Sequence, residues 1–160
     1  MNEQHFWSII ETAWPTTKQA TALREKAFAG MLEPNKALKT VQKQILENLT
    51  HALDQLAQDD LLTFDRILER KLYDIDREDV HKYTDGSDDG FLYCRGFIVS
   101  MGREYYEMVN ADPAKATSDV EFEEFCYHPY SMYENKYGTP PPPSGLSRET
   151  GSNQAGWDEN

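Results

Sequence analysis

Carboxylates and arginines gather in one short stretch of the chain, and they are the residues best suited to chemistry. Asp85, Asp88 and Asp89 lie close together in an acidic turn, and Arg95 and Arg103 follow it. Carboxylates can hold Mg²⁺, while arginines can contact the oxygens of a phosphate group. One interpretation is therefore a metal-assisted hydrolase, or another phosphate-handling enzyme, that uses this Asp/Arg cluster. Structural ion-pair networks produce similar clusters in proteins that have no active site there.

The acidic turn also has part of the spacing of a calcium-binding EF-hand loop. Asp85, Ser87, Asp89 and Gly90 match the first, third, fifth and sixth positions of such a loop. The twelfth position, where a bidentate glutamate is required, is Gly96 in an apolar stretch. We therefore predict that Asp88 or Asp89 caps a helix, because carboxylates suit the positive end of the helix dipole.

Other combinations that are typical of cofactor sites do not occur in the sequence. The four histidines are dispersed, and a zinc site needs three or four ligands at consistent spacing. The sequence contains neither a glycine-rich phosphate loop nor a nucleophile-elbow motif around a serine. We therefore expect no bound metal or other cofactor, and we assign no catalytic residue.

Arg95 is the most informative charged residue, because it lies next to Cys94 in the most apolar helix candidate of the chain. An unpaired buried guanidinium is too costly, so a carboxylate partner is expected. The preceding segment offers four candidates, namely Asp74, Asp76, Glu78 and Asp79. In one interpretation the ion pair fixes the register of two helices. In the other, Arg95 binds an anion in a cleft.

Apolar residues recur at spacings of three and four along most of the chain, and no segment shows sustained alternation. The pattern predicts helices over about residues 3–13, 17–32, 35–57, 59–74 and 88–109. The stretch 88–109 has the widest apolar surface, and its Gly96 and Gly102 would let a neighbouring helix approach closely. We predict an all-α fold, a compact multi-helix bundle around this one central apolar helix.

The carboxy-terminal part of the domain is rich in tyrosine. The capping-box pattern Ser118-x-x-Glu121 predicts a helix start, and Pro129 predicts a break or kink before a last helix. Tyr130 and Tyr133 belong to an aromatic series that either packs in the core or forms a recognition surface for a partner.

Residues 1–138 are predicted to form a single domain, and residues 139–160 a flexible tail. Thr139 to Pro143 has polyproline character, and the remainder of the tail is polar and glycine-rich, which is typical of disordered segments. Trp157 is the anomaly of this tail, because it could dock on the domain or on a partner.

The composition limits the classes of partner. The net charge is −12 and the isoelectric point is about 4.7, whereas nucleic acid or an anionic membrane requires a basic patch. We therefore expect no nucleic acid and no membrane. Residues 54–89 hold twelve acidic and five basic residues, a net charge of −7, which favours a basic protein partner. Without a signal peptide or a Cys-x-x-Cys pair, the protein is expected to be cytoplasmic, with reduced thiols.

A resemblance to a known family agrees with these expectations. The segment from Gly86 to Arg103, with Asp-Asp-Gly-Phe, Arg-Gly-Phe-Ile-Val and Gly-Arg, resembles the signature of the bacterial family catalogued as domain of unknown function 4240. The segment Phe6–Glu11 and the pair Asp112-Pro113 extend the similarity over about residues 4–137. The resemblance implies a mostly helical fold in a bacterial cytoplasmic protein. The family carries no established activity, so no catalytic residue is transferred.

Together these observations favour a cytosolic protein-interaction module without catalysis of its own. One concrete form is an immunity-type inhibitor that binds a basic protein partner. The metal-assisted enzyme remains the alternative, and the oligomeric state is left open. The candidate binding residues are Asp85, Asp88, Asp89, Arg95, Arg103, Tyr130 and Tyr133.

Overall fold

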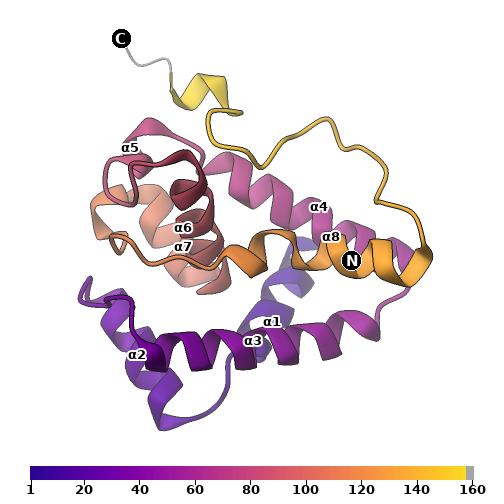
Figure 1. Ribbon diagram of the computed structural model, residues 1–160, viewed down its shortest axis with the longest axis horizontal. Helices are drawn as coiled ribbons and strands as arrows, with labels where there is room; N and C mark the ends of the chain where they lie inside the picture. Colours follow the sequence, from indigo (N-terminus) through magenta and orange to yellow (C-terminus); the bar gives the residue numbers. More distant parts are fainter. Residues whose placement is uncertain (158–160) are drawn as a thin grey trace.

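The computed structural model describes residues 1–157, and within them the chain forms α-helices and short 3-10 helices but no strand (Figure 1). This confirms the predicted all-α class. The α-helices are α1 (Glu3–Ala13), α2 (Lys18–Phe28), α3 (Lys36–Asp54), α4 (Gln58–Asp74), α5 (Glu78–His81), α6 (Asp88–Ser100), α7 (Arg103–Ala111) and α8 (Glu123–Tyr137). The 3-10 helices are η1 (Pro113–Lys115) and η2 (Gln154–Gly156).

The first three helices begin where the sequence provides a capping side chain. The side-chain oxygens of Asn2, Thr17 and Asn35 accept hydrogen bonds from backbone N–H groups in the first turns of α1, α2 and α3. Each cap satisfies a donor that the helix itself leaves unpaired. Helix starts that depend on local side chains were therefore predictable.

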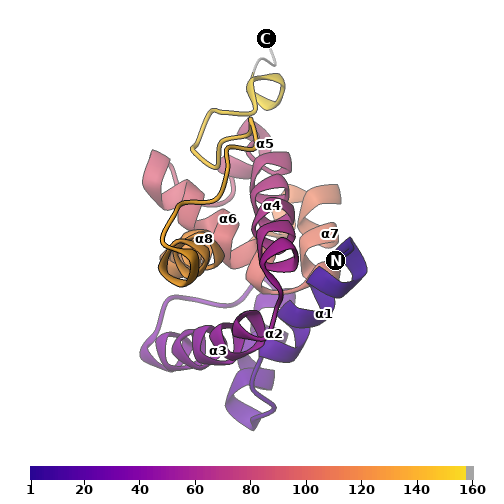
Figure 2. The same cartoon turned by 90° about the vertical axis from the view of Figure 1, so that its right-hand side faces the viewer.

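Helix α6 is the centre of the core, because every residue from Gly90 to Ser100 except Tyr93 is buried. It packs against α4, α7 and α8, while α3 contacts α1, α2 and α8. Figure 2 shows α8 nearly end-on, with α3 below it. Helix α6, which follows the acidic turn, is consequently packed on several sides.

The stretch that was predicted as one central helix is divided into α6 and α7 at Gly102, which has a φ of 96°. The last carbonyl groups of α6 find partners outside the helix. Trp14 donates its indole N–H to the Ser100 carbonyl over 2.7 Å, and Arg24 donates to the Met101 carbonyl over 2.7 Å. These long-range contacts end the helix, and the left-handed glycine lets the chain turn into α7.

Helix α8 differs from the prediction at both its start and its middle. It begins at Glu123, because the backbone N–H of Phe122 donates to the carbonyl of Tyr93 on α6 and the Ser118 hydroxyl donates to the Thr84 carbonyl. Ser118 therefore contacts another part of the fold and does not cap α8. Pro129 lies inside α8 and does not end it.

After α8 the chain crosses back over the domain. Residues 139–157 contain only η2 as regular structure, in agreement with their composition. In Figure 1 this segment runs from the end of α8 across α4 towards α5. Arg148 is buried, and Trp157 packs against His81 and Phe91. Polar contacts of Arg148 and the packing of Trp157 attach this segment to the domain.

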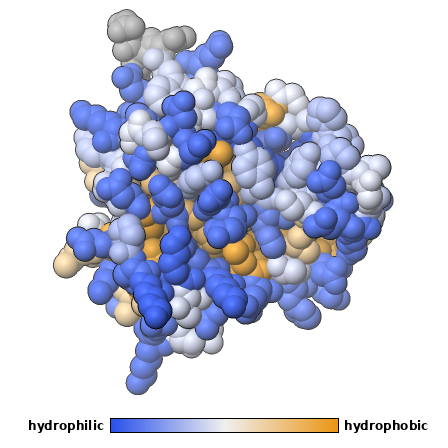
Figure 3. All heavy atoms as spheres, viewed as in Figure 1, coloured by the Kyte–Doolittle hydropathy of each residue, from blue (hydrophilic) through white to orange (hydrophobic). Residues whose placement is uncertain are grey.

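The surface is mostly hydrophilic. Figure 3 shows one face on which hydrophobic residues are visible mainly in a band across its lower half. Both cysteines, Cys94 and Cys126, are buried and free. No helix in residues 1–157 combines the length and hydropathy that crossing a membrane would take.

Candidate functional site

The acidic turn before α6 is held by its own hydrogen bonds. The carboxylate of Asp85 accepts from the Ser87 N–H over 2.7 Å and from the Ser87 hydroxyl over 2.6 Å. The Ser87 hydroxyl oxygen in turn accepts from the Gly90 N–H, so Ser87 is the N-cap of α6. Neither Asp88 nor Asp89 is the cap, although both lie exposed in the first turn, where carboxylates complement the helix dipole.

The hydrogen bonds from the Ser87 side chain and backbone lower the pKa of the Asp85 carboxyl below its ordinary value. A carboxyl with a lowered pKa in the folded state stabilises the fold above its unfolded-state pKa, and this contribution is lost as the pH falls through the folded-state value. The stability difference between the wild type and Asp85→Asn should therefore shrink between about pH 6 and about pH 3. Urea denaturation at both pH values measures it. A difference that grows on acidification would contradict the assignment.

The fold adds three further carboxylates to this turn, because the Ser118 hydroxyl donates to the Thr84 carbonyl and the Phe122 N–H donates to the Tyr93 carbonyl. Burial and the nearby carboxylates of Asp85, Asp119 and Glu123 raise the pKa of Glu121, although Lys39 opposes this effect. Tyr93 lies beside Glu123 and Asp89; partial burial and the Glu123 carboxylate raise its pKa. Two of the predicted residues thus belong to a larger acidic face, which consists of Asp85, Asp89, Asp119, Glu121 and Glu123.

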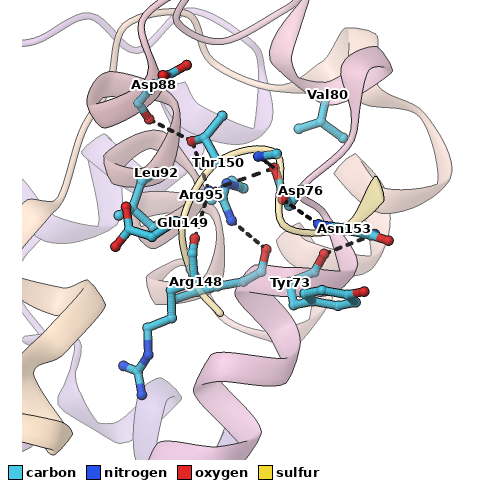
Figure 4. Close-up of polar contacts among 12 residues, drawn as sticks. Tyr73, Asp76, Val80, Asp88, Leu92, Arg95, Arg148, Glu149, Thr150 and Asn153 are labelled. Atoms are coloured by element: carbon cyan, nitrogen blue, oxygen red, sulfur yellow. Dashed lines mark hydrogen bonds and ion pairs between the residues drawn. The ribbon is translucent and has the colours of Figure 1, made fainter. Parts of the chain in front are cut away.

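Arg95 lies behind this turn in the core, with no exposed side-chain surface (Figure 4). Its guanidinium donates to the carbonyl of Leu72 over 2.8 Å, to the carbonyl of Arg148 over 2.9 Å and to the Thr150 hydroxyl over 3.2 Å. Its ion-pair partner is Asp76, one of the four predicted carboxylates, at 3.9 Å. Arg95 therefore joins the end of α4 and the carboxy-terminal segment to α6.

The burial of Arg95 has an energetic cost that these contacts offset. Burial lowers the pKa of the guanidinium, and the carboxylate of Asp76 acts in the opposite direction. The Nε–H of Arg95 has no hydrogen-bond partner among residues 1–157. A buried donor without an acceptor costs about 1–3 kcal/mol, so the surroundings of Arg95 leave one of its hydrogen-bond donors unpaired.

Arg103 is far from the acidic turn. It begins α7, is exposed, and pairs with Glu107 at 2.6 Å one helical turn later. Helix α6 is about 18 Å long between Asp88 and Ser100, and Arg103 follows its far end. The carboxylates and the two arginines of the predicted Asp/Arg cluster are consequently not brought together around one site.

The two tyrosines of α8 have different environments. Tyr133 is 5% exposed, and its hydroxyl accepts a hydrogen bond from Gln58 over 2.9 Å. Tyr130 is half-buried and lines a cleft of about 450 Å³ beneath the proline-rich segment 141–147, together with Asp65 and Glu69. The structure therefore places Tyr133 in the core and Tyr130 near the surface, away from the acidic turn.

Within the part of the chain that the structure describes, no group of three or more histidine, cysteine, aspartate or glutamate side chains is arranged to hold a metal ion. His128 contacts the Thr50 hydroxyl over 2.7 Å between α8 and α3, and burial lowers its pKa. Burial also raises the pKa of the Cys126 thiol to about 12, so this sulfur lies far from the thiolate form at neutral pH.

Sequence reasoning missed the residues that attach the carboxy-terminal segment. Arg148 pairs with Asp65 at 2.6 Å and with Glu69 at 3.7 Å. Asp76 accepts hydrogen bonds from the segment over 2.9 Å and 3.1 Å. The one signal in the sequence was Trp157, whose indole N–H is among these donors.

Comparison with known proteins adds one finding. The model of a family described as "Protein of unknown function (DUF4240)" matches residues 1–135. No curated protein and no solved structure matches the chain. Residues 136–157, which include Arg148 and Trp157, lie outside the matched range.

Proposed function

The chain belongs to the DUF4240 family, whose description assigns no function, and on that premise we propose that it is a protein-interaction module without catalysis of its own. Its acidic face binds a basic protein partner. An immunity-type inhibitor, which masks a basic surface of another protein, is the concrete form of this proposal. We also propose a cytoplasmic location, because both cysteines are free thiols, as in proteins of reducing compartments.

The observation that carries the proposal is that five carboxylates without a basic partner gather on one face. Elsewhere on the molecule many carboxylates have a basic partner, as in the pairs Lys71–Glu3 and Arg77–Asp79. Within residues 1–157, none of the five carboxylates of the acidic face forms an ion pair with a basic side chain. No basic side chain of the described residues therefore neutralises this face through an ion pair.

Electrostatics favours a basic partner over other ligands. Carboxylates that lie close together repel one another, and a basic surface placed against them removes this repulsion. Large exposed hydrophobic side chains are few among the described residues, with Met31 at 72% and Tyr83 at 41% exposure. We therefore expect recognition that depends on charge, with fast association at low salt and weaker binding at high salt.

The test neutralises part of the acidic face. The tagged protein captures its partner from native lysate at low salt, and the purified partner is then measured against Asp85→Asn/Asp89→Asn/Glu123→Gln. Because complementary charges accelerate encounter, we expect the association rate constant to fall at least about tenfold and its salt dependence to weaken. Stopped-flow or biosensor kinetics at two salt concentrations gives both quantities.

The matched control removes the same charge from exposed positions elsewhere, with Glu25→Gln/Glu33→Gln/Asp59→Asn. This variant should bind like the wild type. If both triple variants lose binding equally, net charge alone is responsible, and the acidic face is not the contact surface. If neither loses binding, charge plays no part and the proposal fails.

A further inference from the structure

The carboxy-terminal segment lies against the domain in the manner of a bound peptide. It has no regular structure before η2, and polar groups join it to α4, α6 and α8. Figure 4 shows its contacts with Tyr73, Asp76, Asp88 and Arg95. The connection from α8 is exposed at Pro142, Pro143 and Ser144. A segment that is anchored at defined points and joined by an exposed linker has the arrangement of a tethered ligand.

The first anchor of the segment is an arginine in an acidic pocket. Arg148 is 4% exposed and pairs with Asp65 and Glu69 of α4. It also donates to the carbonyl of Cys126 on α8 over 2.6 Å, and its guanidinium lies 5.4 Å from the centre of the Tyr127 ring. The pocket therefore offers two carboxylates, a carbonyl and an aromatic face, which together suit a guanidinium group.

The second anchor is Asp76, which binds the backbone of the segment. Its carboxylate accepts from the N–H of Gly151 over 3.1 Å, from the N–H of Asn153 over 2.9 Å and from the Trp157 indole over 3.1 Å. A Cβ atom at position 156 would lie 2.9 Å from the carbonyl oxygen of Asp76, so the close approach of the two backbones favours glycine there. The contacts thus depend on the spacing of particular residues along the segment.

We infer that the groove formed by α4, α6, α8 and the connection from α4 to α5 is a peptide-binding site, and that residues 147–157 occupy it as an exchangeable ligand of the same chain. Its ligand class is a peptide with an arginine, followed at this spacing by Thr-Gly, Asn and Trp. The charged groups of the groove, Asp65, Asp76 and Arg95, lie in the range that matches the family, whereas the segment lies beyond it. This inference concerns a different surface from the acidic face and does not rest on the proposed function.

The charged groups of the groove explain why a peptide that displaces the segment must resemble it. Without a bound peptide, the pocket around Asp65 and Asp76 would open to water or hold unpaired charges. A competing peptide therefore has to supply a guanidinium for Asp65 and backbone donors for Asp76. The unpaired Nε–H of Arg95 also offers a hydrogen bond that the present segment does not use.

The experiment cuts the tether in the folded, full-length protein. A protease site inserted between Ser144 and Gly145, both exposed, is cleaved after folding. A fluorescent peptide with the sequence of residues 146–157 is then added, and its binding is followed by anisotropy. The linked segment has an effective concentration in the millimolar range, so we expect the cleaved protein to bind the peptide at least about 100-fold more tightly than the uncleaved protein.

Two controls identify the recognised groups. The same peptide with Arg148→Ala should bind at least about tenfold more weakly to the cleaved protein, because the guanidinium contacts are lost. The cleaved Asp65→Asn protein should show a similar loss, with circular dichroism confirming that it is folded. A scrambled peptide tests whether the order of residues matters.

Two results would contradict the inference. If the cleaved segment remains attached until the domain itself unfolds in urea, the segment is a permanent part of the core and the inference fails. Equal binding of the scrambled peptide would also overturn it, because the groove would then recognise charge without a specific ligand.

Discussion

Replacing Arg95 with methionine is expected to destabilise the fold by about 3–5 kcal/mol, the usual effect of removing one partner from a buried ion pair. The substitution leaves Asp76 without its cationic neighbour at 3.9 Å and removes donors from the carbonyl groups of Leu72 and Arg148. Methionine fills much of the same volume, so the loss reflects these polar contacts more than a cavity. Urea denaturation followed by circular dichroism measures the free energy of unfolding.

The matched control is Arg103→Met, which removes the other arginine of the predicted cluster. The ion pair of Arg103 with Glu107 is exposed, so its loss should cost no more than about 1 kcal/mol. If Arg95→Met were as stable as this control, Arg95 would not be a structural residue and a role in binding would become the better explanation. A cycle with Asp76→Asn separates the ion pair from the bonds to carbonyl groups.

The environment of Arg95 shows which contacts the sequence could predict and which it could not. Its burial and its carboxylate partner were predictable, because an arginine in an apolar helix requires compensation. The bonds to Arg148 and Thr150 were not predictable. They come from a segment whose composition resembles a disordered tail, and composition does not reveal contacts with a distant groove.

Helix existence was predicted better than helix ends, for a similar reason. The side chains of Asn2, Thr17 and Asn35 act locally, and the corresponding starts were found. The end of α6 depends on Trp14 and Arg24, which lie more than seventy residues earlier in the chain. The periodicity of the apolar residues continues past Gly102, so the sequence predicted one helix there. Periodicity contains no information on such distant partners.

The candidate site was predicted in part. Asp85 and Asp89 belong to the acidic face, but Asp119, Glu121 and Glu123 join them only because the chain returns to α6 before α8 begins. Spacing along the sequence indicated a cluster with Arg103, whereas the length of α6 separates the two ends of that cluster. The carboxylates at the start of α6 could be identified from the sequence, whereas the carboxylates that join them in the fold could not.

Gly96→Ala is expected to destabilise the protein by about 1–3 kcal/mol, the typical cost of overpacking a core. A Cβ at this position would overlap the sulfur of Cys126 on α8 and lie 2.9 Å from the carbonyl oxygen of Phe122. The glycine therefore sets the close approach of α6 and α8, as the sequence predicted. Alanine is the better helix former by about 1 kcal/mol, so a net loss means that crowding outweighs propensity.

The control for Gly96→Ala is Gly86→Ala, which lies in the exposed turn with no atom near the added methyl group. This change should alter the free energy of unfolding by no more than about 0.5 kcal/mol. Adding Cys126→Ala to Gly96→Ala removes the overlapping sulfur but leaves the Phe122 carbonyl in place, so the pair should recover only part of the loss. Full recovery would mean that the sulfur alone sets the helix spacing. A stabilised Gly96→Ala single variant would mean that α8 can move away from α6, which would contradict a fixed contact between the two helices.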